Sequence, residues 1–389
     1  MSKPMLNRLD LGKAGKWEQM VLGVTDVARL PDPTGIVSYA SELDDGLELY
    51  RVSCPIGVLL VIFEARPEVV VNIAALAIRS GNAAILKGGK ESNRTTVELA
   101  NAISEGLKQA SLPPTYIQAI QTRAEVSALL ALDQFIDLVI PRGSNSLVRN
   151  IQNNTRIPVM GHADGLCHVY LHKDADQDKA IRVAVDSKVD YPSACNAVET
   201  LLVHRELLHS VWVEVARALL REGVQLICDS DALSAIPSES VTPPKPDSVV
   251  NSTEQSYHIE HLDLKLSVKT VDSLDAAIQH INTHSSHHTD AIVTESGEEG
   301  AKFCRGVDSA GTFVNASTRF ADGFRYGFGT EVGISTGRIH ARGPVGLEGL
   351  VIYKYTMLSK ANKGHVVGEF GDGKKSYKHT PIKISTVPF

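Results

Sequence analysis

Short apolar runs alternate with amphipathic stretches through the first half of the chain, and this alternation predicts the fold. Residues 57–63 are continuously apolar, as expected for a strand that is buried on both faces of a parallel sheet. Residues 67–79 are typical of a helix with Pro67 in its first turn. Further strands are expected at 83–86, 116–120 and 136–140, and further helices at 92–110, 125–132 and 144–151. Strands that alternate with helices indicate βαβ units and a doubly wound parallel sheet.

A second set of alternating elements follows in the other half of the chain. Strands are expected at 198–203, 224–227, 262–271 and 290–294, and helices at 206–221, 273–282 and 297–306. Because single hydrophobic cores stop growing near roughly 250–300 residues, the 389-residue chain is expected to form two α/β lobes. Residues 229–257, rich in Ser, Asp and Pro, are expected to be a surface insertion. Asp45-Gly46 lies between two short apolar stretches and predicts a β-hairpin.

Composition and charge exclude several classes of protein. The chain has 39 basic and 45 acidic side chains, a net charge of −6, so it has no basic field for nucleic acid or an anionic membrane. Its longest apolar run, 56–63, is far shorter than the ~20 residues of a membrane span. The first residues lack the apolar core of a secretory signal. Five cysteines without a C-x-x-C pair favour free thiols in a reducing compartment, and therefore the cytoplasm.

The common cofactor and metal motifs are incomplete in this sequence. Residues 87–92 resemble a phosphate loop without its full spacing, and 327–333 are one residue too long for G-x-G-x-x-G. Four histidines lie close together and could bind a metal, but they are also typical of a surface or a substrate pocket: His280, His284, His287 and His288. We predict no metal, because no carboxylate triad accompanies them.

Cys195 has the setting that best suits a nucleophile. It lies in a turn of small residues, Ser193-Ala194-Cys195-Asn196, that leads into the apolar strand 198–203. Backbone amides that follow such a turn can lower the pKa of a thiol and can bind an oxyanion. An unreactive turn cysteine is the alternative on spacing alone. The remaining cysteines are expected to be structural: Cys54, Cys167, Cys228 and Cys304.

The sequence around this cysteine is similar to a known enzyme family. Residues 191–202, YPSACNAVETLL, resemble the nucleophile segment of the gamma-glutamyl phosphate reductases, a branch of the aldehyde dehydrogenase superfamily. Further blocks with the same resemblance occur in the same order at 61–68, 80–91, 140–145, 314–323 and 339–348. The likeness runs from about Leu6 to about Val367 and is greatest to the eukaryotic members, including the reductase half of bifunctional pyrroline-5-carboxylate synthetases.

This resemblance implies a fold and an activity. It implies an aldehyde dehydrogenase-like α/β fold with an NADP-binding lobe at 1–35 and 53–188 and a catalytic lobe at 189–345. A small β element for oligomerisation is implied at 36–52 and 346–389. The implied reaction is the NADPH-dependent reduction of L-glutamyl 5-phosphate to L-glutamate 5-semialdehyde and phosphate, through a cysteine thioester, in L-proline biosynthesis. The implied partners are other copies of the chain and a separate glutamate 5-kinase.

The resemblance also assigns candidate site residues. Cys195 is the implied nucleophile, and the backbone amides at Cys195 and Asn196 are the implied oxyanion donors. The implied cofactor-binding residues are Lys87, Lys90, Ser92, Arg142, Gly143 and Ser144. At Lys90 an ammonium would attract the 2′-phosphate of NADPH, although a solvated loop charge is the alternative. The candidate binders of the substrate's anionic groups are Arg66, Asn315, Arg319, Arg338 and Arg342, and for each arginine a surface ion pair is the alternative.

Three departures from the family pattern carry expectations of their own. Residues 159–165, VMGHADG, lack the Glu that activates water in hydrolytic aldehyde dehydrogenases, so we expect slow hydrolysis of the thioester. The residue that contacts the nicotinamide ribose corresponds to either His258 or Glu260. Family members usually carry a helical segment before the block that begins at Leu6, which leaves a non-catalytic, reductase-like subunit as the alternative function.

Overall fold

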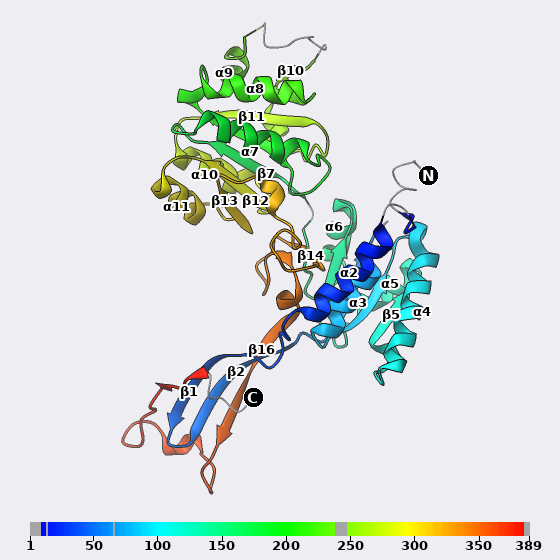
Figure 1. Ribbon diagram of the computed structural model, residues 1–389. Coiled ribbons are helices and arrows are strands. Elements are labelled where there is room, and N and C mark those ends of the chain that lie inside the picture. Colours follow the sequence, from blue (N-terminus) through cyan, green and yellow to red (C-terminus); the bar gives the residue numbers. More distant parts are fainter. Residues whose placement is uncertain (1–8, 13–14, 65–66, 163, 238–246, 385–389) are drawn as a thin grey trace.

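The computed structural model describes residues 9–12, 15–64, 67–162, 164–237 and 247–384. Figure 1 shows two α/β lobes and a long antiparallel arm. The first lobe contains a four-stranded parallel sheet in the order β5-β4-β3-β6. Its strands are β3 (Val58–Phe63), β4 (Ala83–Lys87), β5 (Ile117–Ile120) and β6 (Leu138–Arg142). Its helices are α2 (Lys16–Arg29), α3 (Val69–Arg79), α4 (Asn93–Gln109), α5 (Arg123–Leu129) and α6 (Asn145–Asn153).

The apolar run of β3 is explained by its central place in this sheet. Leu59 and Val61 pack into a core on one face, whereas Leu60 and Ile62 pack into a second core on the other face. The chain winds from β3 through β4 to β5 and then returns to place β6 on the other side of β3. This reversal creates a crevice at the carboxyl ends of β3 and β6, where doubly wound sheets bind ligands.

The second lobe contains a seven-stranded parallel sheet in the order β10-β9-β11-β8-β7-β12-β13. Its strands are β7 (Cys167–Leu171), β8 (Val198–His204), β9 (Gln225–Cys228), β10 (Val249–Asn251), β11 (Lys265–Val271), β12 (Thr289–Val293) and β13 (Gly311–Val314). Its helices are α7 (Gln177–Val189), α8 (Val211–Arg221), α9 (Ser230–Ser234), α10 (Leu274–His284) and α11 (Gly297–Gly306). Helices α7 and α8 share one core and α10 and α11 share another, so both faces of the sheet are buried.

The arm is a four-stranded antiparallel sheet in the order β16-β2-β1-β17. Its strands are β1 (Val37–Asp44), β2 (Leu47–Pro55), β16 (Val351–Ser359) and β17 (Thr380–Pro381). The predicted hairpin at Asp45-Gly46 is confirmed, and Gly46 adopts the positive φ of 73° that such a turn requires. The long antiparallel pairing of β16 with β2 joins the hairpin to residues 351–359.

The structure corrects the predicted limits between the parts. Strand β7 pairs with β8 and β12, so the second lobe begins before the expected position 189. Val332, Val345 and Leu347 pack in the core of the first lobe, although they were assigned to the second. Residues 229–257 are not only an insertion, because α9 and the edge strand β10 belong to the second lobe. In the described part of the chain, no helix is long and apolar enough to cross a membrane.

Candidate active site

Cys195 lies in the short connection between α7 and β8, at the carboxyl end of the helix and before the first residue of the strand. A buried ion pair joins the two elements, because Lys188 Nζ of α7 lies 2.8 Å from Glu199 Oε2 of β8. The same ammonium donates to the carbonyl of Val198 at 3.0 Å. Both ends of the nucleophile turn are therefore tied together inside the protein.

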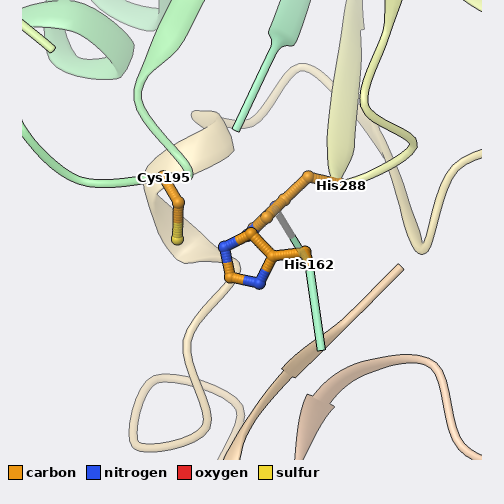
Figure 2. A group of neighbouring side chains, drawn as sticks. All are labelled: His162, Cys195 and His288. Atoms are coloured by element: carbon orange, nitrogen blue, oxygen red, sulfur yellow. The ribbon is translucent and has the colours of Figure 1, made fainter. Parts of the chain in front are cut away.

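Two histidines face the thiol of Cys195. Figure 2 shows His162 and His288 close to the sulfur, and one nitrogen of each ring and Sγ all lie within 4.8 Å of one another. The rings pack edge to face, with centroids 5.1 Å apart. His162 comes from the connection between the lobes, and His288 directly precedes β12. The two lobes therefore contribute to one cluster around the thiol.

Hydrogen bonds fix the orientation of these imidazoles. His162 Nδ1 lies 3.1 Å from the carbonyl oxygen of Ile334, which can only accept, so Nδ1 carries the proton and Nε2 holds a free lone pair. His288 Nδ1 lies 3.0 Å from Thr289 Oγ1, and its buried Nε2 has no hydrogen-bond partner among the described residues. Burial lowers the pKa of His162, so its ring is neutral near pH 7.

The backbone around Cys195 is closely packed. A Cβ atom on Gly165 would lie 2.2 Å from the carbonyl oxygen of Cys195, so only glycine fits beside the nucleophile turn. The N–H groups of Cys195 and Asn196 have no acceptor among the described residues, as expected of oxyanion donors. The Asn196 side chain donates to the carbonyl of Ala321 at 2.9 Å, so this side chain holds the turn in place.

Among the candidate substrate arginines in the described part of the chain, only Arg319 lies beside the nucleophile turn. Its Nη1 donates to Asn196 Oδ1, and its Nε lies 3.0 Å from Asp190 Oδ2. A second arginine, Arg325, lies 3.4 Å from the same carboxylate and was missed from the sequence. A small cavity of about 160 Å³ is lined by Asp186, Asp190, Arg319, Phe320 and Arg325.

The other candidate substrate residues have partners elsewhere. Arg338 and Arg342 both pair with Asp308, a contact of the kind that the surface ion-pair alternative describes. Asn315, in the left-handed region at φ 55°, exchanges two side-chain hydrogen bonds with the backbone of Thr294. These bonds extend the pairing of β12 and β13 and leave the amide occupied. Arg66 lies outside the described residues.

The candidate cofactor residues gather at the carboxyl edge of the first sheet. Lys87 ends β4, exposed Lys90 begins the 3₁₀ turn η1 (Lys90–Ser92), and Ser144 precedes α6. Arg142 ends β6, but its guanidinium pairs with Glu331 at 3.8 Å. A Cβ on Gly143 would lie 2.8 Å from Glu64 Oε2, the far end of an exposed side chain that can move aside.

Ser92 does not have the predicted capping role. It is buried, and its hydroxyl donates to the carbonyl of Gly89 at 3.2 Å instead of accepting from the first turn of α4. The reason is the η1 turn, which precedes α4 and directs the Ser92 side chain inward. The prediction of a serine cap for this helix is therefore wrong.

The two candidates for the ribose contact lie in different surroundings. Glu260 Oε1 accepts from the backbone N–H of Gly165 at 2.9 Å, next to the loop that carries His162, and burial raises the pKa of this carboxyl. His258 instead lies 4.0 Å from Glu254 on the other side of this segment, and its ring is tilted against that of His284. Glu260 is the residue that faces the candidate site.

Besides Arg325, sequence reasoning missed three features of this site. His162 lay in a segment that was noted only for the Glu it lacks, and His288 was grouped with neighbours that the structure separates from it. The signal that could have found His288 is its position, because it directly precedes a strand of the sheet that also contains β8. His162 lies in the connection between α6 and β7 and had no such signal. The buried pair of Lys188 and Glu199 had no signal in the hydrophobic pattern, since charged residues near strand ends are usually exposed.

Comparisons with known proteins agree with this architecture. Residues 29–228 match the model of the aldehyde dehydrogenase family. The chain is 52% identical to the probable gamma-glutamyl phosphate reductase of Schizosaccharomyces pombe, over 100% of this chain and 85% of that protein. It is 51% identical to the gamma-glutamyl phosphate reductase of Saccharomyces cerevisiae, over 100% of this chain and 87% of that protein.

Solved structures give the same result. The gamma-glutamyl phosphate reductase of Thermotoga maritima superposes with a TM-score of 0.87 and 35% identity, over 94% of this chain and 86% of that chain. An acetylating aldehyde dehydrogenase from Geobacillus thermoglucosidasius shares the fold, with a TM-score of 0.63 and 17% identity, over 93% of both chains. The predicted fold class is thus confirmed. The chain belongs to the aldehyde dehydrogenase family and, within it, to the oxidoreductases of the gamma-glutamyl phosphate reductase branch.

Proposed function

We propose that this chain reduces L-glutamyl 5-phosphate to L-glutamate 5-semialdehyde and phosphate with NADPH, through a thioester on Cys195, in L-proline biosynthesis. The observation that carries the proposal is the cluster of Cys195 with two oriented imidazoles. Relatives named for this reaction match the whole of the chain. An acyl phosphate is a reactive intermediate, so a glutamate 5-kinase must supply it.

The cluster can activate the thiol. The neutral His162 ring holds a free lone pair on Nε2, so this nitrogen can accept the proton of Cys195. The thiolate then forms a bond to the acyl carbon, and the bond from that carbon to the phosphate oxygen breaks, with the electron pair leaving on phosphate. The N–H groups of Cys195 and Asn196 stabilise the oxyanion, and one such donor is typically worth about 3 kcal/mol.

The charged cavity next to this turn suits the amino-acid end of the substrate. Arg319 and Arg325 can bind the α-carboxylate, and Asp186 and Asp190 can bind the α-ammonium. Because Arg319 also bonds to Asn196, one residue links the cavity to the nucleophile turn. This link positions the δ-carbon of a bound glutamyl chain relative to Cys195. Asn315, Arg338 and Arg342 are not part of this proposal, because they do not line this cavity.

The edge of the first sheet fits a dinucleotide phosphate. Gly143 and Ser144 are exposed directly before α6, and the first N–H groups of a helix can bind a phosphate. Lys87, Lys90, Gly143 and Ser144 would hold the phosphates, and Glu260 would contact the nicotinamide ribose. Lys90 favours NADPH, since its ammonium attracts a 2′-phosphate. When bound, NADPH supplies the hydride that converts the thioester to the aldehyde.

The arm suits assembly of several copies. Strand β16 is an edge strand with an unpaired side, and Tyr353, Tyr355 and Met357 on it are exposed. Such an edge can pair with the same strand of a second copy, so we propose a homo-oligomer joined through the arm. The five cysteines are free thiols, which supports a reducing compartment such as the cytoplasm.

The reverse reaction tests this function. Purified protein should oxidise glutamate 5-semialdehyde with NADP⁺ at a steady rate only when inorganic phosphate is present, because phosphate must release the acyl group and no Glu lies in the 159–165 segment to activate water. Formation of NADPH without phosphate at the same steady rate would contradict the acyl-phosphate product. No NADPH formation under any of these conditions would favour the non-catalytic alternative.

A further inference from the structure

We propose that Cys195, His162 and His288 form a binding site for Zn²⁺, through which the ion reversibly blocks the thiol. The three donor atoms come together inside the protein from three segments, and all lie within 4.8 Å of one another (Figure 2). The inhibitory consequence rests on the proposed function, since it needs Cys195 to be the nucleophile. The metal site itself does not.

The histidines are arranged as metal ligands usually are. A ligating imidazole generally donates its second N–H to an oxygen atom, which fixes the ring and leaves the other nitrogen for the metal. His162 meets this condition through the carbonyl of Ile334 at 3.1 Å. His288 meets it through Thr289 Oγ1 at 3.0 Å, when the hydroxyl accepts.

The buried nitrogen of His288 provides a second, independent observation. His288 is fully buried, and its Nε2 has no hydrogen-bond partner among the described residues. An unsatisfied polar atom in a protein interior destabilises the fold, so a group that binds it contributes favourable free energy. A cation held between this nitrogen and the thiolate satisfies both atoms.

The donor set selects the ion. One thiolate and two imidazoles suit Zn²⁺, which accepts tetrahedral sets of sulfur and nitrogen and leaves a fourth position for water. Ligand atoms around such an ion lie roughly 3.3–3.7 Å apart, so the donors here, all within 4.8 Å of one another, need to approach by at most about 1.5 Å. Mg²⁺ and Ca²⁺ prefer oxygen ligands and are not expected to bind. A thiolate that is coordinated to Zn²⁺ cannot attack an acyl carbon.

A second histidine cluster offers an internal control. Glu254, His258 and His284 also bring three donor atoms within 4.8 Å, but they lie on the surface of the second lobe and contain no thiol. Here His284 Nε2 already has a partner, Glu254 Oε1 at 2.9 Å. Variants of this cluster therefore separate binding at Cys195 from binding elsewhere.

The experiment measures how fast iodoacetamide alkylates Cys195, by peptide mass spectrometry, with and without Zn²⁺. With Zn²⁺ at ten times its Kd, mass action predicts an alkylation rate about elevenfold slower, restored by EDTA. Cys304 in the same sample should show no change, because no histidine cluster contains it. His284→Ala should keep the protection, whereas His162→Asn and His288→Asn should each lose it. Mg²⁺ should give none.

Three results would overturn the proposal. They are an unchanged rate in the wild-type protein at saturating Zn²⁺, protection that persists in both Asn variants, and protection that His284→Ala abolishes. If one Asn variant fails to fold, the other variant and a Co²⁺ complex of the wild-type protein remain decisive. That complex should show a thiolate-to-Co²⁺ charge-transfer band, and its absence counts against the site. Alkylation needs no turnover, so this test can fail while the reductase assay succeeds, and the reverse.

Discussion

Replacing Lys188 with Met should destabilise the second lobe strongly. The change keeps a long side chain but leaves Glu199 buried without its partner at 2.8 Å. Removing one member of a buried ion pair typically costs about 3–5 kcal/mol, because the remaining charge is uncompensated. For a unit of this size, each kcal/mol lowers the Tm by roughly 2–4 °C, so we expect a decrease of roughly 6–20 °C.

The pH dependence of this loss identifies its cause. Burial already raises the pKa of Glu199 to about 7, although Lys188 opposes the shift. Loss of the ammonium raises this pKa further. A carboxyl whose pKa is higher in the folded than in the unfolded protein stabilises the fold at low pH, and this contribution is lost as the pH rises. Lys188→Met should therefore be least stable at alkaline pH. The double variant Lys188→Met/Glu199→Gln should lose this dependence.

Urea unfolding followed by circular dichroism, at about pH 5.5 and about pH 8, measures these differences. The loss of stability in Lys188→Met should be larger at the higher pH, and adding Glu199→Gln should recover part of it there. A deficit below about 1 kcal/mol, the range of an exposed ion pair, would refute the structural role. So would a deficit that is equal at both pH values.

Three further substitutions test the site. Arg319→Ala removes charge-assisted hydrogen bonds worth about 1.5–3 kcal/mol, so it should lower kcat/KM for the semialdehyde roughly 10- to 100-fold. The control Arg338→Ala removes only an exposed ion pair and should change kcat/KM little. Lys90→Glu should weaken the binding of NADPH by about 1–3 kcal/mol and leave the binding of NADH unchanged. An unchanged ratio of kcat/KM for the two cofactors would show that Lys90 does not contact the 2′-phosphate. Gly165→Ala should abolish activity by displacing the Cys195 backbone, whereas Gly106→Ala, with open space around it, should be neutral in the same assay.

The sequence predicted those parts of the fold that depend on local patterns. The apolar run of β3 and the turn at Gly46 both lie where the pattern placed them, because burial on two faces and positive φ restrict residue choice locally. The limits between lobes were wrong, since strand β7 could join either sheet until its neighbours were known. Local pattern carries no information on that choice.

The candidate site was predictable only in part. Cys195 was predicted from its turn and from the family resemblance, and the structure places two imidazoles beside it. The sequence alone could not show which of Arg319, Arg338 and Arg342 lies beside Cys195, because all three are arginines in the same region of the chain. What separates them is the carboxylate each one meets, Asp308 or Asp190, and these contacts span 30 to 129 positions in the chain.

The most direct test of the account is to look for the acyl enzyme on Cys195. Wild-type protein is mixed with glutamate 5-semialdehyde and NADP⁺ without phosphate, digested, and analysed by mass spectrometry, with Cys228→Ala as a matched control for a buried cysteine. We expect a glutamyl group on Cys195, together with about one NADPH per active site, and loss of both in Cys195→Ala. An acyl group on another cysteine, or turnover that persists in Cys195→Ala, would contradict the central claim.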